Sequence, residues 1–267
     1  MKARRNRYFS EIEELNRIFE NGLLDPVFQP ILQIDNGQIF GYEGLIRGPA
    51  TSSLYLPARL FAAGNRAGLL TELEMLCCRK VVRQFARLGA QGGLFLNVSP
   101  QTVMWVREDA ERISNFILDC GLEIAQTTIE LTEHQNITDH STFRQALKVF
   151  RSAGFRVAID DLGEGFSSLR LWSELRPDFV KIDMHFVQGI SRDPLKLQFL
   201  KSLQQIAQRC DTALVAEGVE DIDDLSVLGD LGITYAQGYF IERPSKKPGT
   251  IVNAASAGSL LSKQRDL

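Results

Sequence analysis

Short, continuously apolar runs recur along the chain, with room for a helix between most of them. Eight of these runs are candidate strands: VFQPILQI (27–34), IFGYEGLI (39–46), GLFLNVS (93–99), TTIELTE (127–133), FRVAIDD (155–161), DFVKID (178–183), ALVAEG (213–218) and TYAQGYF (234–240). Several are apolar at consecutive positions, whereas a strand that faces water on one side alternates apolar and polar residues. The pattern therefore predicts strands buried on both faces, as in a parallel sheet covered by helices.

Between the runs, apolar residues recur at helical spacing. Four segments show this spacing: 114–122, 143–154, 195–210 and 221–232. The segment 48–92 is predicted to hold two helices. Near the N-terminus the pattern predicts a helix over 10–22, with Ser10 and Glu13 as a capping box at its start and Gly22 at its end.

The order of these elements favours one barrel. Asp35-Asn36-Gly37 is a hairpin turn signal, so the first two strands are predicted to be antiparallel. Eight strands alternating with helices over about 250 residues match a TIM-like (β/α)8 barrel of the α/β class, with an antiparallel first strand. A doubly wound open sheet is the alternative, but it usually has fewer strands and a glycine-rich first turn. We expect a lead segment at 1–22, the barrel at 23–250 and a tail at 251–267.

Composition narrows the class of protein. The 267 residues are 44% hydrophobic and 24% charged, which fits a folded domain with a large core. The net charge of −3 supplies no basic field for a nucleic acid polymer or a membrane surface. No run of about 18 apolar residues is present, so no membrane span is expected. The four cysteines form no C-x-x-C pair and no secretion signal is evident, so we expect reduced thiols and a cytoplasmic protein.

Polar side chains stand near the carboxyl ends of most of the predicted strands. They are Glu43, Asn97, Glu130, Asp160, Asp161, Lys181, Glu217 and Gln237. Taken singly, each is explained as a turn former or a helix cap. Together they would converge on one mouth, because barrel enzymes assemble their active sites from several strands at that end.

Five of these residues are carboxylic acids, and like charges in one low-dielectric mouth raise each other's pKa. Either shared protons, as in an acid/base dyad, or bound divalent cations would compensate for the repulsion. Five carboxylates and an amide oxygen exceed the needs of a dyad and suit the hard cations Mg²⁺ and Mn²⁺. A zinc site is disfavoured, because His134, His140 and His185 have no His-x-x-x-His spacing.

The stretch RVAIDDLGEGFSSL (156–169) places two carboxylates side by side at the end of an apolar run. If Asp161 lies just past the strand end, the chain can turn there and Asp160 and Asp161 can both face the mouth. Gly163 and Gly165 would let the following loop lie close to a ligand, although a lone Gly-x-Gly is more often only a turn.

A site with two cations is the usual apparatus for attack of water on a phosphodiester. Lys181 would project into the acidic ring, where it could hold the water or help to deprotonate it; a structural salt bridge is the alternative. Arg47, four residues after Glu43, could bind a phosphate oxygen. The metals would also let an acidic protein bind an anionic substrate.

These residues resemble those of the EAL domain family, the bacterial cyclic di-GMP phosphodiesterases. EGLIR (43–47) is similar to the E-A-L-L-R motif for which the family is named. The remaining family blocks follow in order: NVSP (97–100), ELTE (130–133), IDDLGEGFSSL (159–169), PDFVKID (177–183), AEGVE (216–220) and AQGYF (236–240). The resemblance covers residues from about 28 to 244 and implies cleavage of the second messenger cyclic di-GMP to linear pGpG.

The resemblance also implies roles for individual residues. Two cations, Mg²⁺ or Mn²⁺, would be held by Glu43, Asn97, Glu130, Asp160, Asp161 and Glu217. Catalytic roles would fall to Lys181, Glu217, Glu43, Glu133 and Gln237, with Glu133 anchoring the loop after Asp161. Substrate contacts would come from Gln29, Leu45, Arg47, Asp183 and Gln237. A homodimer through the region near the 161–169 loop is expected, as are fused sensory or cyclase domains in a longer chain.

The chain departs from the family pattern at a few positions. Gly44 replaces the alanine of the naming motif, and Glu164 and Phe166 alter the loop after the paired aspartates. None of the metal-ligand positions is lost, which favours an active phosphodiesterase. A receptor that binds cyclic di-GMP without cutting it is the alternative. Another metal-dependent barrel enzyme, such as an enolase-like lyase, would leave the ordered blocks unexplained.

Overall fold

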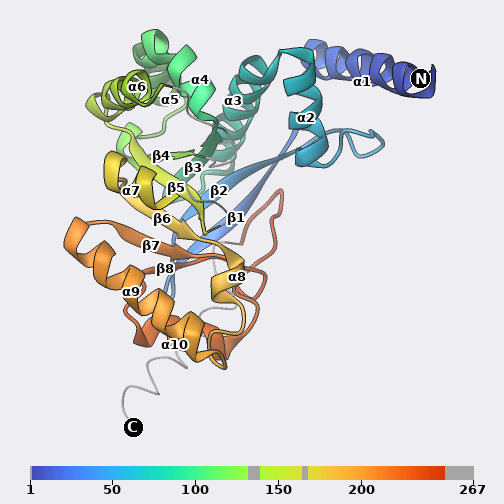
Figure 1. Ribbon diagram of the computed structural model, residues 1–267. Helices are drawn as coiled ribbons and strands as arrows, with labels where there is room; N and C mark the ends of the chain where they lie inside the picture. The colour runs from blue at the N-terminus through green and yellow to red at the C-terminus, as the bar shows by residue number, and fades with distance from the viewer. Residues whose placement is uncertain (1, 132–138, 164–167, 250–267) are drawn as a thin grey trace.

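The eight predicted strands all form, and they pair in chain order into a closed barrel (Figure 1). The computed structural model describes residues 2–131, 139–163 and 168–249. The strands are β1 (Asp25–Gln33), β2 (Gln38–Arg47), β3 (Gly93–Val98), β4 (Thr127–Leu131), β5 (Arg156–Leu162), β6 (Phe179–Ile182), β7 (Ala213–Ala216) and β8 (Tyr235–Ala236). β1 is antiparallel to both β2 and β8, and the remaining neighbours are parallel. The predicted TIM-like barrel with an antiparallel first strand is confirmed.

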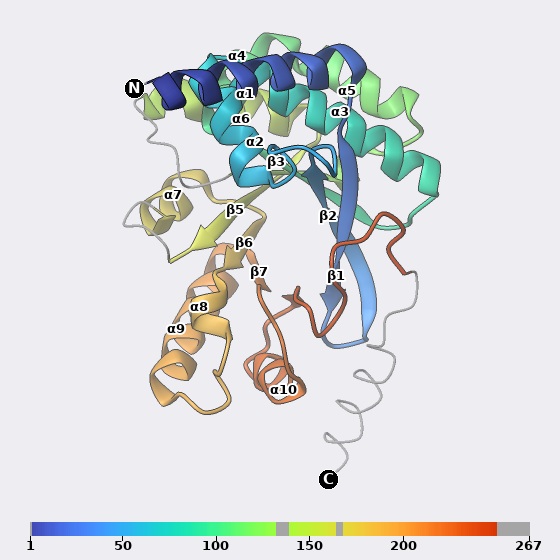
Figure 2. The same ribbon diagram turned by 90° about the vertical axis from the view of Figure 1, so that its right-hand side faces the viewer.

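Helices connect the strands on the outside of the barrel. They are α1 (Lys2–Asn21), α2 (Pro57–Ala67), α3 (Leu70–Leu88), α4 (Pro100–Trp105), α5 (Ala110–Asp119), α6 (His140–Ser152), α7 (Ser168–Leu175), α8 (Met184–Val187), α9 (Pro194–Cys210) and α10 (Ile222–Asp230). Figure 2 shows α1 to α6 gathered on one side of the barrel and α8 to α10 on the opposite side. Two short 3₁₀ turns, 107–109 and 124–126, complete the α4–α5 and α5–β4 connections.

The first helix is longer than the sequence pattern predicted. It begins at Lys2 and passes through Ser10, so the predicted capping box at Ser10 and Glu13 is wrong. The residues before Ser10 include alanine, lysine and arginines, which are strong helix formers, and their propensity extends the helix beyond its apolar stripe. The predicted end is confirmed, because the helix stops at Asn21 and Gly22 has a φ of +58°.

The hairpin between β1 and β2 also forms as predicted. Gly37 has a φ of +70°, and its N–H donates to the carbonyl of Gln33 over 3.0 Å. The side chain of Asn36 accepts a hydrogen bond from the backbone N–H of Gln38. Among the described helices, none is long and apolar enough to cross a membrane. All four cysteines are free, as expected.

Apolar side chains fill the barrel interior toward the amino ends of the parallel strands. We call this set of side chains the apolar layer. It consists of Ile31, Phe95, Ala158, Phe179 and Val215, with Phe40, Ala213 and Tyr235 packed against it. The ring centroids of Phe95 and Phe179 lie 5.1 Å apart, and those of Phe40 and Tyr235 lie 4.2 Å apart. This end of the barrel is therefore closed, and any site inside the strands must lie at the other end.

Candidate active site

Polar side chains form the next layer of the interior, toward the carboxyl ends of the parallel strands. Side chains two residues apart on a strand share a face, so Asn97 follows Phe95, and Lys181 follows Phe179, into the barrel. On the antiparallel first strand the order is reversed, and Gln29 of β1 pairs with Glu43 of β2. We call this set the polar layer: Gln29, Glu43, Asn97, Glu130, Asp160, Lys181, Glu217 and Gln237.

Lys181 lies at the centre of the polar layer and is only 1% exposed. Its ammonium nitrogen is 2.6 Å from Glu130 Oε1 and 2.7 Å from Glu217 Oε1. It is 3.3 Å from both Glu43 Oε2 and Asp160 Oδ1. One cation is therefore shared among four carboxylates. Such a cation is buried at a high desolvation cost, which only close pairing can offset.

Amide side chains hold Glu43 from both sides. Asn97 Nδ2 donates to Glu43 Oε1 over 2.8 Å, and Gln237 Nε2 donates to Glu43 Oε2 over 2.7 Å. Gln237 Nε2 also lies 3.0 Å from Gln29 Oε1, and Gln29 Nε2 donates to the backbone carbonyl of Glu242. This chain of hydrogen bonds fixes the orientation of the Glu43 carboxylate.

The adjacent Asp160 and Asp161 reach the same mouth through a β-bulge. Ile159 pairs with Val180 and Leu162 pairs with Ile182, so the two aspartates oppose Lys181 alone. Asp161 has a φ of +52°, a left-handed conformation that aspartate tolerates better than most residues. The expectation that Asp161 lies just past the strand end was wrong, because β5 continues to Leu162. The bulge, rather than a turn, brings both Asp160 and Asp161 to the mouth of the barrel.

The charges of the polar layer strongly perturb one another. Burial, together with the charges of Glu43, Asp160 and Glu217, raises the pKa of Glu130 well above its usual value despite Lys181. Burial raises the pKa of Glu217 in the same way. For Glu43, burial opposes ionisation, but the charge of Lys181 and hydrogen bonds from Asn97, Gln237 and Lys181 lower its pKa. The polar layer therefore carries more carboxylates than its one ammonium can neutralise.

The polar layer and Asp161 also suit a divalent cation. Oxygens of Asp160, Asp161 and Glu217 all lie within 4.8 Å of one another. Glu130 Oε2 is buried and has no hydrogen-bond partner among the described residues, and Asp160 Oδ1 lies near Lys181 without hydrogen-bond geometry. Buried carboxylate oxygens without partners are costly, and hard cations are bound by oxygens of this kind. The donor set present therefore fits Mg²⁺ or Mn²⁺.

A cavity of about 300 Å³ opens above the polar layer. It is lined by Gln29, Glu43, Leu45, Asp161, Asp183, Glu217 and Gln237, all of which are predicted site residues. Arg47 is not among the lining residues, and its guanidinium donates to the carbonyl of Ile46. Glu133, Glu164 and Phe166 lie outside the described residues.

Five further residues line this cavity that the sequence did not assign a role: Met184, Gly218, Glu220, Gly238 and Tyr239. The ring of Tyr239 stacks under the guanidinium of Arg243 at 4.1 Å. A Cβ atom on Gly238 would lie 2.1 Å from the carbonyl oxygen of Val219, so only glycine allows this approach. The signal in the sequence that could have indicated these residues is Gly218 in AEGVE and Gly238 in AQGYF.

The fold and the acidic centre together define a class: a TIM-like α/β barrel whose carboxylates gather where barrel enzymes bind their substrates. Within that class, the chain matches the EAL domain family over residues 12–244 and belongs to it. The predicted family is confirmed.

Relatives of known name are similar over most of the chain. The chain is 27% identical to the probable cyclic di-GMP phosphodiesterase PdeG of Escherichia coli, over 90% of this chain and 49% of PdeG. It is 30% identical to the cyclic di-GMP phosphodiesterase RocR of Pseudomonas aeruginosa, over 87% of this chain and 60% of RocR. The chain thus spans about half to three fifths of the length of these relatives.

Solved structures show the same fold. Klebsiella pneumoniae BlrP1, in its calcium and cyclic di-GMP complex, is 28% identical with a TM-score of 0.78, over 86% of this chain and 58% of BlrP1. A manganese and cyclic di-GMP complex of BlrP1 has a TM-score of 0.76 to this chain.

Proposed function

We propose that this protein hydrolyses cyclic di-GMP to linear pGpG with the help of two divalent cations, Mg²⁺ or Mn²⁺. The observation that carries the proposal is the polar layer, in which four carboxylates surround Lys181 and a bulge adds Asp161 to Asp160. Family membership and the names of relatives supply the substrate and the reaction. The metal-bound complexes of BlrP1 support the choice of cofactor.

In this proposal Glu43, Asn97, Glu130 and Asp160 hold one cation, and Asp160, Asp161 and Glu217 hold the other. Bound there, the cations would make a water molecule more acidic and neutralise charge on the phosphate oxygens. Asn97 and Gln237 keep the Glu43 carboxylate turned toward the mouth through their hydrogen bonds. Glu133, which is outside the described residues, is proposed to anchor the loop after Asp161.

Lys181 serves as a donor of hydrogen bonds rather than as a base. Burial alone would lower its pKa, but the charges of Asp160, Glu130, Glu217 and Glu43 raise the pKa of Lys181 well above its usual value. In the metal-free protein the ammonium therefore keeps its protons at neutral pH. It can orient the attacking water and offset negative charge that develops on the phosphate.

The substrate is proposed to enter the cavity above the polar layer. Gln29, Leu45, Asp183 and Gln237 line this cavity and would contact the nucleotide. Arg47 would join them only through a change of its side chain, because its guanidinium now bonds to the carbonyl of Ile46.

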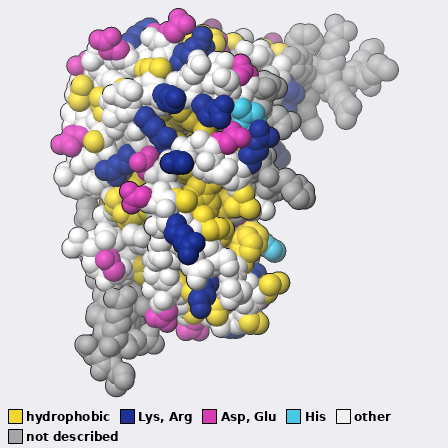
Figure 3. Space-filling view, turned by 60° about the vertical axis from the view of Figure 1, so that its left-hand side comes forward, with side chains coloured by type: hydrophobic (Ala, Val, Ile, Leu, Met, Phe, Trp, Pro, Cys, Tyr) yellow, Lys and Arg dark blue, Asp and Glu magenta, His cyan; other side chains and the backbone are white. Residues whose placement is uncertain are grey.

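We also propose a cytoplasmic homodimer that forms through the region next to the 161–169 loop, and fused sensory or cyclase domains in a longer chain. Apolar side chains gather on the face that carries α7 and α9 (Figure 3). On that face Leu169 is 55% exposed and Leu195 is 78% exposed. Exposed apolar surface next to the loop is what a second copy would cover.

The test is incubation with cyclic di-GMP and either Mn²⁺ or Mg²⁺, with pGpG separated by chromatography. We expect product with metal and none after chelation. Glu43→Gln should abolish turnover and leave the protein folded, whereas Glu111→Gln, on the exposed face of α5, should have wild-type activity. Tight binding of the nucleotide without any product would identify a receptor instead.

Lys181→Ala separates catalysis from binding. If Lys181 orients the water, kcat should fall more than KM changes. A rise in KM at constant kcat would assign Lys181 to substrate binding.

A further inference from the structure

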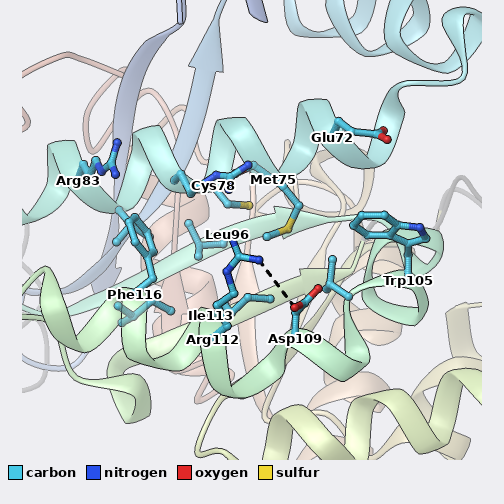
Figure 4. A pocket seen from close by; sticks show the side chains of 14 residues that line it. Glu72, Met75, Cys78, Arg83, Leu96, Trp105, Asp109, Arg112, Ile113 and Phe116 are labelled. Atoms are coloured by element: carbon cyan, nitrogen blue, oxygen red, sulfur yellow. Dashed lines mark hydrogen bonds and ion pairs between the residues drawn. The ribbon is translucent and has the colours of Figure 1, made fainter.

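A second cavity, which shares no lining residue with the cavity above the polar layer, lies between α3 and α5, with β3 as its floor. Figure 4 shows the side chains that line it. Its volume is about 430 Å³, within the usual size of small-molecule sites, about 300–1,000 Å³. The deep walls are apolar, and Val82, Leu96 and Ile117 are buried there. An apolar ligand could therefore bury its surface in this cavity.

One end of this cavity is basic. Arg79 and Arg83 lie four residues apart on α3, so they share a face, and both line the cavity. Neither arginine has an ion pair with another described residue. Like charges at this spacing repel, and an anion bound between them would relieve the repulsion. The guanidinium of Arg83 lies over the ring of Phe116 at 5.3 Å, which holds it in place while its N–H groups stay available.

The other end is acidic. Figure 4 shows Glu72, Asp109 and the exposed Trp105 at the end opposite Arg83. Asp109 pairs with Arg112 at 4.0 Å, but Glu72 has no ion pair with another described residue. This end would repel a ligand with several negative charges. The charge pattern favours a single carboxylate at the arginine end and an uncharged apolar body along the rest.

The floor of the cavity leads to the polar layer. Leu96 on β3 directly precedes Asn97, and the Cys78 thiol lies 3.9 Å from the carbonyl oxygen of Asn97. A small neighbouring cavity lies on the other side of Cys78 and Leu96 and is lined by Glu43 and Asn97. A ligand in the α3–α5 cavity would thus press on the wall that supports Asn97.

We propose that the α3–α5 cavity binds an amphipathic monocarboxylate, with its apolar body between α3 and α5 and its carboxylate held by Arg79 and Arg83. Binding shifts Leu96 and Cys78 and, through them, the side chain of Asn97. The binding site stands by itself. A regulatory effect of this ligand on catalysis rests on the proposed function, because Asn97 holds a metal ion only in that proposal.

The test uses metal-free protein and no substrate, so its result does not depend on turnover. Dodecanoate, below its micelle concentration, is titrated by calorimetry, with dodecanol as the uncharged control. We expect saturable binding at one site, and weakening of about tenfold for Arg83→Ala because one charge-assisted contact is lost. Arg87→Ala, on the exposed next turn of α3 and outside the cavity, should bind like the wild type.

Ile113→Trp fills the cavity and should abolish binding while the melting temperature shows a folded protein. Protein labelled with ¹⁵N-asparagine reports the coupling: the side-chain amide signal of Asn97, assigned by its loss in Asn97→Asp, should shift with dodecanoate. Binding without this shift would overturn the coupling. No binding, equal binding by Ile113→Trp, or equal binding of dodecanol would overturn the site. A change of oligomeric state in Ile113→Trp without dodecanoate binding would mark the face as an interface between copies instead.

Discussion

The two layers inside the barrel are built by the same strands and are only two residues apart, yet they follow different rules. In the apolar layer Phe95 and Phe179 are stabilised by leaving water and by contact with each other. In the polar layer Lys181 and Glu130 are just as buried, at 1% and 0% exposed, but their burial costs free energy that pairing must offset. The apolar layer stabilises the fold, whereas the polar layer lowers stability at the place where the proposed reaction would occur.

The position of a residue along a strand determines its role in the barrel more than its burial does. The apolar layer needs volume and shape, so many residues of similar size can serve there. The polar layer needs a balance of charge, and it remains unbalanced with four carboxylates around one ammonium. In the proposed function, a divalent cation from solution would complete this balance.

The largest effect should come from replacing the shared cation by an apolar residue of similar length. Lys181→Met leaves four buried carboxylates unpaired and should lower the free energy of unfolding by about 3–5 kcal/mol in chelator at neutral pH. Mn²⁺ should recover part of this loss. Urea denaturation measures both values.

The matched change in the apolar layer is Ile31→Leu, which keeps volume and changes only shape. It should cost less than about 1.5 kcal/mol, with or without metal. If Lys181→Met and Ile31→Leu lowered the free energy of unfolding equally, charge pairing would matter no more in the polar layer than side-chain shape does in the apolar layer.

Much of this arrangement could be predicted from the sequence, because the polar layer follows from a period of two along buried strands. Runs such as TTIEL and PDFVKI carry one polar residue inward near the end of an apolar stretch, so the sequence alone predicts that Glu130 and Lys181 lie in the site. The barrel itself followed from the number and order of the runs.

What the sequence did not reveal depends on contacts between distant segments. The bulge at Asp160 and Asp161 is a property of the pairing between β5 and β6, and no local pattern shows it. Met184 and Tyr239 enter the cavity because Gly218 and Gly238 let neighbouring loops approach closely. The start of α1 was missed because helix propensity, not amphipathic spacing, determines it.

A smaller effect should come from the outer face of β2, directly behind the polar layer. Gly44 follows Glu43, and a Cβ atom there would lie 2.3 Å from Cγ1 of Val81 on α3. The alanine of the family motif is therefore not interchangeable here, because Val81 already occupies its space. Gly44→Ala should cost about 1–3 kcal/mol through overpacking.

The double variant Gly44→Ala with Val81→Ala separates this clash from other causes. It should be less destabilised than the sum of the two single variants, since the smaller side chain at 81 makes room. Additive losses in urea denaturation would show that the clash with Val81 is not the cause.

The smallest effect is a pH dependence that distinguishes the polar layer from the rest of the protein. Glu130 and Glu217 have folded pKa values well above the usual 4.5, through burial and neighbouring carboxylates. Above this usual value the folded state binds more protons than the unfolded state, so metal-free stability should fall as pH rises. Glu43, with its lowered pKa, has the opposite sign and loses its contribution as pH falls. Lys181, with its raised pKa, contributes across the neutral range and loses its effect only in alkali.

The double variant Glu130→Gln with Glu217→Gln isolates the contribution of the raised groups. In chelator, its free energy of unfolding should fall less steeply than that of the wild type between about pH 5 and pH 8, since two of the proton-binding groups are gone. Carboxylates outside the polar layer are common to both proteins and cancel in the difference. Mn²⁺ should flatten or reverse the slope of the wild type, because the cation replaces the protons, and should leave the double variant nearly unchanged. Parallel slopes for the two proteins in chelator would show that the polar layer holds no excess of protons and that its charges are already balanced without metal.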